Sequence, residues 1–66
     1  MQITVNGEAR ELETAVTITG LLNLLGLPNG KIAVERNLEI VPQSTYDEIV
    51  LADGDRIEIV HFIGGG

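Results

Sequence analysis

Residues 17–26, Thr-Ile-Thr-Gly-Leu-Leu-Asn-Leu-Leu-Gly, carry the clearest helical pattern in the chain. Apolar residues recur there at i, i+3, i+4 and i+7 and share one helix face: Ile18, Leu21, Leu22 and Leu25. Thr17 is a residue type that caps helix N-termini, and Gly26 can take the left-handed conformation that ends a helix. Pro28 prevents the helix from resuming. The stretch therefore predicts one short helix, which needs a sheet to pack on.

A β-hairpin is predicted before this helix. Residues 1–5 alternate apolar and polar side chains, as a half-buried strand does. Asn6-Gly7 follows, and both residue types tolerate the positive φ angles of a type I′ turn. In the returning strand, residues 8–12, Arg10 falls on the same face as Ile3. We expect its aliphatic stem to lie along the edge of the core with the guanidinium in water.

Three more strands are predicted after the helix. Residues 32–34 are apolar on both faces, which favours a central position in a sheet. Residues 40–41 form a short strand after a turn at Asn37, whose type is left open because leucine follows it. Residues 53–55, Asp-Gly-Asp, form a tight turn into the last strand, residues 57–63. Between these strands Tyr46 is expected to fold over the core.

The order hairpin, helix, strand, short strand, strand belongs to the α+β class. Both ends of the chain are strands, so the economical packing places the first and last strands side by side and parallel, with the helix on one face. That arrangement is a β-grasp (ubiquitin-like) mixed sheet. We expect a β-grasp domain over residues 1–63 and a flexible glycine tail over residues 64–66.

Composition excludes several classes of function. The chain has 66 residues, no cysteine and a net charge of −6, so disulfides are excluded and a nucleic-acid partner is not expected. A small domain without disulfides fits the cytoplasm, and no apolar stretch reaches the length of a membrane span. Phe62 and Tyr46 are the only aromatic residues, so the core must be aliphatic.

Catalytic and metal sites are not supported. Ser44 and His61 are the only serine and histidine, and nothing in the sequence places them together. Asp53 and Asp55 resemble a fragment of a calcium loop but lack its later ligands, so a hairpin turn explains them better. By elimination the chain is a carrier or binding module rather than an enzyme.

The tail supplies the one chemically distinctive group. Gly64, Gly65 and Gly66 have no Cβ, so their backbone can enter a channel too narrow for other residues. The α-carboxylate of Gly66 is then open to an activating enzyme, which could convert it to an acyl-adenylate and load it with sulfur or another nucleophile. The competing interpretation is a frayed terminus or a linker without function.

The last strand also predicts an interaction surface. If Ile57 and Ile59 point inward, Val60 and Phe62 point outward beside Ile63. Three large apolar side chains in water on so small an acidic domain would favour a protein partner. The alternative is that the strand bulges or that Phe62 folds under a loop.

Four segments in this order and spacing resemble the ThiS family of ubiquitin-like sulfur carriers from bacterial thiamine synthesis. They are Met1-Gln2-Ile3-Thr4-Val5-Asn6-Gly7, Leu21-Leu22-Asn23-Leu24-Leu25, the segment Val34-Glu35-Arg36-Asn37-Leu38-Glu39-Ile40-Val41-Pro42, and Asp53-Gly54-Asp55-Arg56-Ile57-Glu58-Ile59-Val60. The resemblance covers the whole chain and ends at the diglycine. Arg10 and Leu38 depart from it, because the family commonly has an apolar residue and a glycine there.

The resemblance implies a function for the tail. An E1-like adenylyltransferase, ThiF, would use ATP to adenylate Gly66, and sulfur from a donor system would give a thiocarboxylate. Thiazole synthase, ThiG, would use that sulfur to build the thiazole ring. The carrier itself would need no cofactor.

Three alternatives stay open at this point. One is a sulfur carrier for another product, such as the small subunit of molybdopterin synthase. Another is a β-grasp interaction module whose glycines are incidental. The third is a protein-conjugating modifier, in which the same tail would end in an isopeptide bond.

Overall fold

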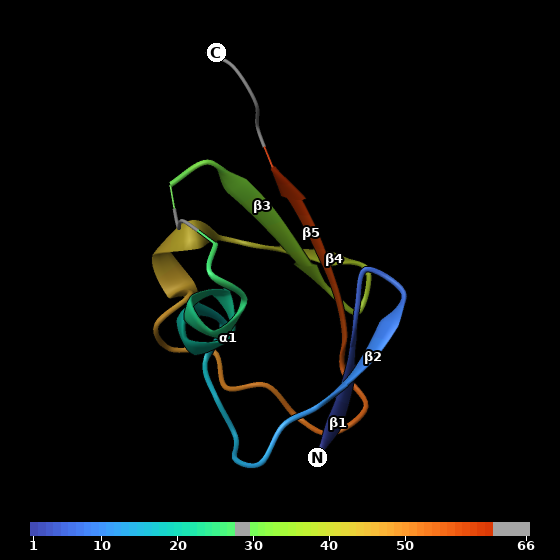
Figure 1. Cartoon of the computed structure of the whole chain (residues 1–66). Coiled ribbons are helices and arrows are strands. Elements are labelled where there is room, and N and C mark those ends of the chain that lie inside the picture. The colour runs from blue at the N-terminus through green and yellow to red at the C-terminus, as the bar shows by residue number, and fades with distance from the viewer. Residues whose placement is uncertain (28–29, 62–66) are drawn as a thin grey trace.

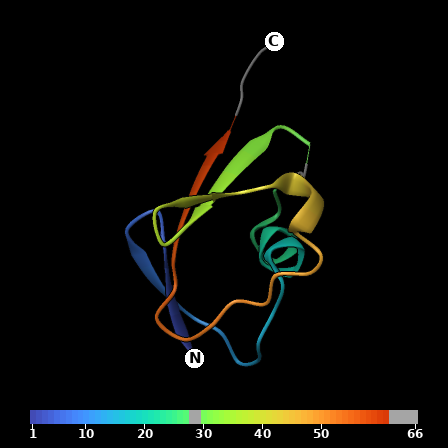
Figure 2. The ribbon, with the colours of Figure 1, turned by 180° about the vertical axis from the view of Figure 1, so that it is seen from behind.

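A computed structural model describes residues 1–27 and 30–61. They form a mixed sheet with the helix α1 packed on one face (Figure 1). The strands are β1 (Gln2–Val5), β2 (Glu8–Glu11), β3 (Ile32–Arg36), β4 (Glu39–Val41) and β5 (Arg56–His61). The helix α1 spans Ile18–Leu25, and a short 3-10 helix, η1, spans Gln43–Thr45. Seen from behind, η1 lies beside α1, on the same side of the sheet (Figure 2).

The topology confirms the predicted β-grasp arrangement. The strand order is β2-β1-β5-β3-β4, so the first and last strands lie side by side at the centre. They run parallel, with Thr4 opposite Arg56 and Val5 opposite Ile57, and the other neighbouring strands are antiparallel. The predicted glycine tail, residues 64–66, lies outside the described residues.

Both hairpins turn through two residues with positive φ angles. Asn6 and Gly7 have φ angles of 48° and 85°, as the sequence predicts for a type I′ turn. The turn between β3 and β4 is of the same kind, with Asn37 at 52° and Leu38 at 74°. Leucine pays a steric penalty in this conformation that glycine does not.

The two ends of α1 are capped as the sequence predicts. Thr17 Oγ1 accepts a hydrogen bond from the amide of Gly20 at 3.0 Å. Gly26 is left-handed at φ 72°, and the amide of Leu27 donates to the carbonyl of Leu22. Pro28 lies outside the described residues.

The segment after η1 completes the first turn of α1. The amide of Ile18 donates to Ile49 O and that of Thr19 to Tyr46 O, each at 3.1 Å. These bonds satisfy amides that a helix cannot satisfy internally. The segment between η1 and β5 therefore holds the helix against the sheet. Tyr46, which is 3% exposed, packs in the core as expected.

Within residues 1–27 and 30–61 the core is aliphatic apart from this tyrosine. Its buried residues are Ile3, Val5, Leu12, Ile18, Leu21, Leu22, Ile32, Val34, Val41, Tyr46, Leu51, Ile57 and Ile59. The predicted helix stripe supplies the three residues Ile18, Leu21 and Leu22, all at most 1% exposed, and Leu25 packs at the margin. Among the described residues, no helix has the length and apolar character needed to cross a membrane.

Candidate functional site

The last strand, β5, lies at the centre of the sheet and leads into the C-terminal residues. It pairs with β1 on one side and with β3 on the other, where Ile32 stands opposite His61. The predicted site residues Phe62, Ile63, Gly64, Gly65 and Gly66 lie outside the described residues. The structure thus describes the strand from which the tail departs and the surface around that strand.

The sheet face turned away from α1, here called the outer face, carries exposed apolar side chains. Val60 is 57% exposed, whereas its neighbour Ile59 is 8% exposed on the opposite face. Ile40 on β4 is 75% exposed and stands opposite Glu35, which places it on the same outer face. Val60 therefore has the orientation that strand alternation predicts, and Ile40 is an additional apolar residue on this face that sequence reasoning missed.

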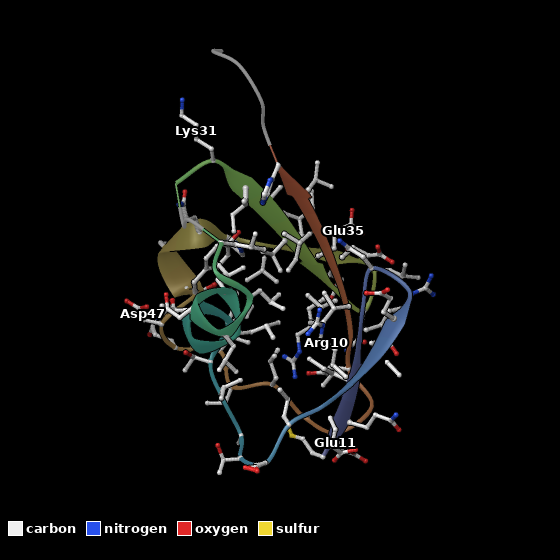
Figure 3. The ribbon with its side chains drawn as sticks, viewed as in Figure 1. Arg10, Glu11, Lys31, Glu35 and Asp47 are labelled. Atoms are coloured by element: carbon white, nitrogen blue, oxygen red, sulfur yellow. The ribbon has the colours of Figure 1, made fainter. Side chains whose placement is uncertain are left out.

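Carboxylates lie between these two apolar residues. Glu35 on β3 stands opposite Glu58 on β5 and opposite Ile40 on β4, and it points away from α1 (Figure 3). Arg56 pairs with Glu58 at 3.6 Å, but both side chains are largely accessible, so this pair adds little stability. The outer face thus offers apolar contacts within an acidic surface, which suits a partner with apolar and basic groups.

A buried carboxylate sits where β5 begins. Asp55 Oδ2 accepts hydrogen bonds from Arg36 Nε at 2.9 Å and from the amide of Ala52 at 2.8 Å. Asp55 Oδ1 accepts from Asn37 Nδ2 at 3.1 Å, and Asn37 Oδ1 accepts from the amide of Arg56 at 2.9 Å. This cluster joins the turn before β5 to the hairpin between β3 and β4, and so fixes the start of the last strand.

The cluster sets the protonation state of Asp55. Burial alone would raise the pKa of this carboxyl. The hydrogen bonds from Ala52, Asn37 and Arg36, together with the charge of Arg36, outweigh burial and hold the pKa below its ordinary value. Sequence reasoning interpreted Asp55 only as a turn residue, because Arg36 is 19 positions away and no local pattern predicts the pairing.

The other candidate groups are engaged structurally or lie apart. Asp53 Oδ1 accepts a hydrogen bond from the amide of Gln2 at 2.7 Å, and both aspartates lie at a turn into β5, as predicted. The predicted hairpin is wrong, because a long loop precedes this turn and β5 pairs with β1 and β3. Ser44 lies in η1, and His61 ends β5 opposite Ile32. Within residues 1–27 and 30–61, no three His, Cys, Asp or Glu side chains cluster in a way that could hold a metal ion.

A hollow of about 580 Å³ lies between β2 and α1, on the side of the sheet opposite to Val60. Leu12, Leu21, Leu24 and Leu25 contribute its apolar walls. Arg10 extends from β2 into this space, toward the helix (Figure 3). Ile3 stands opposite Arg10 in the register, so the arginine lies at the edge of the core with its side chain exposed, as predicted.

Similarity to known proteins extends over nearly the whole chain. The sequence model of the ThiS family matches residues 3–66. A crystal structure of the thiamine biosynthesis protein ThiS from Geobacter metallireducens superimposes with a TM-score of 0.85 at 32% identity, with both chains covered completely. The sulfur carrier protein ThiS of Bacillus subtilis is 52% identical over 50 residues, which are 76% of each chain.

A longer protein also contains a similar segment. A thiazole synthase of Paramagnetospirillum magneticum is 52% identical over all 66 residues of this chain. The chain spans only 20% of that relative's length. That thiazole synthase therefore contains, within its own polypeptide, a segment similar to this chain.

Proposed function

The chain belongs to the ThiS family, and on that premise we propose that it is a sulfur carrier for thiazole formation in thiamine synthesis. The carrier is the substrate of an activating enzyme and not an enzyme itself. The observation that carries the proposal is the match to the ThiS family model, which runs to residue 66 and so includes the glycine tail. The family match favours this pathway over molybdopterin synthesis.

The proposed chemistry takes place at the carboxylate of Gly66. One carboxylate oxygen attacks the α-phosphorus of ATP, and pyrophosphate leaves, which gives an acyl-adenylate. A donor then supplies sulfur at the oxidation level of sulfide. This sulfur attacks the acyl carbon, AMP leaves with the departing oxygen, and a proton is released. The product is a thiocarboxylate, which is a better nucleophile than the carboxylate.

The sequence and fold suit this division of labour. Gly64 and Gly65 add no side chain to the segment before the reacting carbon, so that segment stays slim enough for an enzyme channel. The folded body has a buried apolar core and holds β5 from both sides. ATP is bound by the activating enzyme, so the carrier needs no cofactor of its own.

We propose two protein partners. An E1-like adenylyltransferase of the ThiF kind would contact the outer face through Val60, together with Phe62 and Ile63, while the tail enters its active site. Thiazole synthase of the ThiG kind would receive the sulfur. The fused relative supports the second partner, because segments of one polypeptide commonly act in one process. Adenylation consumes ATP, and we therefore place the carrier in the cytoplasm.

Intact-mass spectrometry tests the proposal directly. The chain is incubated with the E1-like adenylyltransferase of its host, ATP and a sulfide source. Its mass should rise by the difference between sulfur and oxygen, and the change should map to the peptide that ends at Gly66. Omission of ATP is the control. A chain whose mass never changes in the complete mixture would overturn the proposal, and a branched conjugate would indicate a protein modifier instead.

A growth experiment identifies the pathway. Deletion of the coding sequence should leave the host dependent on thiamine or on its thiazole precursor. The mass test would still succeed for a carrier that serves another product, but this dependence would then be absent.

A further inference from the structure

The side chain of Asn6 contacts the last strand at Ile59, two residues before β5 ends at His61. Its Oδ1 accepts a hydrogen bond from the amide of Ile59 at 2.7 Å, and its Nδ2 donates to the carbonyl of Ile59 at 3.2 Å. The backbone amide of Asn6 also donates to Ile57 O at 2.9 Å. One residue therefore bonds to β5 at two successive positions along one edge of the strand.

This side chain extends the ladder between β1 and β5 beyond the end of β1. Backbone pairing of the two strands ends with Val5 opposite Ile57, because the chain turns away at Asn6 and Gly7. The next amide and carbonyl on that edge belong to Ile59. A carboxamide carries the same donor and acceptor as a peptide group, so the Asn6 side chain takes the place of the missing peptide unit.

The type I′ turn alone does not require asparagine at this position. Glycine adopts the same positive φ without strain and serves equally well in such turns. What asparagine adds is its reach to Ile59. Beyond Ile59, β5 continues through only Val60 and His61 before the described part of the chain ends, and β3 pairs with both of them.

We propose that Asn6 is a positioning residue for the C-terminal tail. It holds the β1-facing edge of β5 at Ile59 while β3 holds the other edge, and this fixes the direction in which the chain leaves the sheet. The role rests on the proposed function, in which Gly66 must reach an active-site channel. Small errors in placement of a reacting group are costly, because a shift of about 1 Å can lower a rate about 100-fold.

The chain contains a matched control at the other end of the same strand. Asn37 occupies the same position in the second type I′ turn, with φ 52°. Its Oδ1 accepts from the amide of Arg56, and its Nδ2 donates to Asp55. Asn6→Gly and Asn37→Gly therefore each remove one side-chain bond to a β5 amide and a second bond, to the Ile59 carbonyl in the first case and to the Asp55 carboxylate in the second. Only Asn6→Gly removes its bonds in the half of β5 from which the chain continues to the tail.

The test uses the full chain and the E1-like adenylyltransferase of its host. ATP–pyrophosphate exchange is measured against carrier concentration, at a temperature where circular dichroism shows each variant to be folded. Asn6→Gly should lower kcat about tenfold, the effect of one to two lost hydrogen bonds, and leave KM unchanged. Asn37→Gly should keep kcat within about twofold, because the bonds it removes lie at the far end of β5. Amide hydrogen exchange at Ile59 should accelerate in the first variant only.

A conservative variant separates positioning from general stability. Asn6→Asp keeps the positive φ and the acceptor for the Ile59 amide but loses the donor to the Ile59 carbonyl. Its second carboxylate oxygen faces the Ile59 carbonyl oxygen without a donor between them, so kcat should fall below that of the parent. This variant also serves if Asn6→Gly does not fold.

The possible results are distinguishable. Equal losses in Asn6→Gly and Asn37→Gly, or an unchanged kcat in Asn6→Gly and Asn6→Asp, would overturn the positioning role and leave the carrier function intact. A parent chain that supports no pyrophosphate exchange would overturn the carrier function, and the positioning role would fall with it.

Discussion

Asp55 accepts a hydrogen bond from Arg36 at 2.9 Å, and this contact links the start of the last strand to the strand beside it. The Asp55 side chain is 8% exposed and that of Arg36 is 31% exposed, so the carboxylate is shielded from solvent and the guanidinium is partly accessible. The cluster also satisfies the amide of Ala52 and the side chain of Asn37. Removal of the carboxylate would leave several polar groups without a partner, which is costly.

The first prediction concerns pH and this carboxylate. The folded state holds the pKa of Asp55 below its ordinary value, so folding favours the ionised form. Its contribution is complete above the unfolded pKa of about 4 and is lost as pH falls through the lower folded pKa. Urea unfolding should show a steeper loss of stability below about pH 4 in the parent than in Asp55→Asn. Parallel curves for the two proteins would contradict the assignment.

The second prediction concerns the strained turn residue Leu38. Its φ of 74° costs a leucine about 1–2 kcal/mol, and the side chain is 73% exposed, so little burial offsets this strain. Leu38→Gly should raise the free energy of unfolding by about 0.5–1 kcal/mol after the backbone entropy of glycine is subtracted. Leu38→Ala keeps the Cβ and should bring no gain. Equal stabilities of the glycine and alanine variants would contradict the turn geometry.

The sequence predicted those parts of the fold that local patterns encode. The helix stripe, the Thr17 cap and the Asn6-Gly7 turn each depend on neighbours within a few residues, and each was found. The parallel pairing of the terminal strands followed from topology rules.

What sequence reasoning missed are side-chain contacts between distant segments. The Asn6–Ile59 bonds span 53 positions and the Arg36–Asp55 pair spans 19, so no local window contains both partners. The same limit applied to the outer face, where Ile40 joins Val60 only once the sheet order is known. For the tail, the residue types alone indicate the chemistry.

The third prediction tests the core contribution of α1. Leu22 is 0% exposed, and Leu24 on the same helix is 66% exposed. Leu22→Ala should lower the free energy of unfolding by about 2–5 kcal/mol, a large share for so small a domain. Leu24→Ala should change it by no more than about 0.5 kcal/mol. Chemical denaturation of both variants measures the difference, and similar losses would show that the helix packs with another face.

The fourth prediction tests the outer face as a docking surface. Val60→Lys should weaken binding to the E1-like adenylyltransferase at least about tenfold, since it places a charge in an apolar contact. The melting temperature should change little, because Val60 is 57% exposed and a lysine stem can lie along the sheet. Leu24→Lys makes the same change at an exposed leucine on α1 and should bind like the parent. Calorimetric titration decides between the surfaces, and equal affinities for the two variants would remove Val60 from the interface.

The fifth prediction concerns the carboxylate that is proposed to carry sulfur. The reacting carbon belongs to Gly66, and any side chain at Gly65 or any added residue displaces or thickens the segment that must enter the channel. Gly65→Val, or one alanine added after Gly66, should abolish ATP–pyrophosphate exchange. Circular dichroism and the melting temperature should remain those of the parent, because the body of the domain is unaltered. Gly64→Ala is the graded control and should be milder, since it lies farther from the reacting carbon. An extended variant that is adenylated as fast as the parent would show that the reaction does not use this carboxylate.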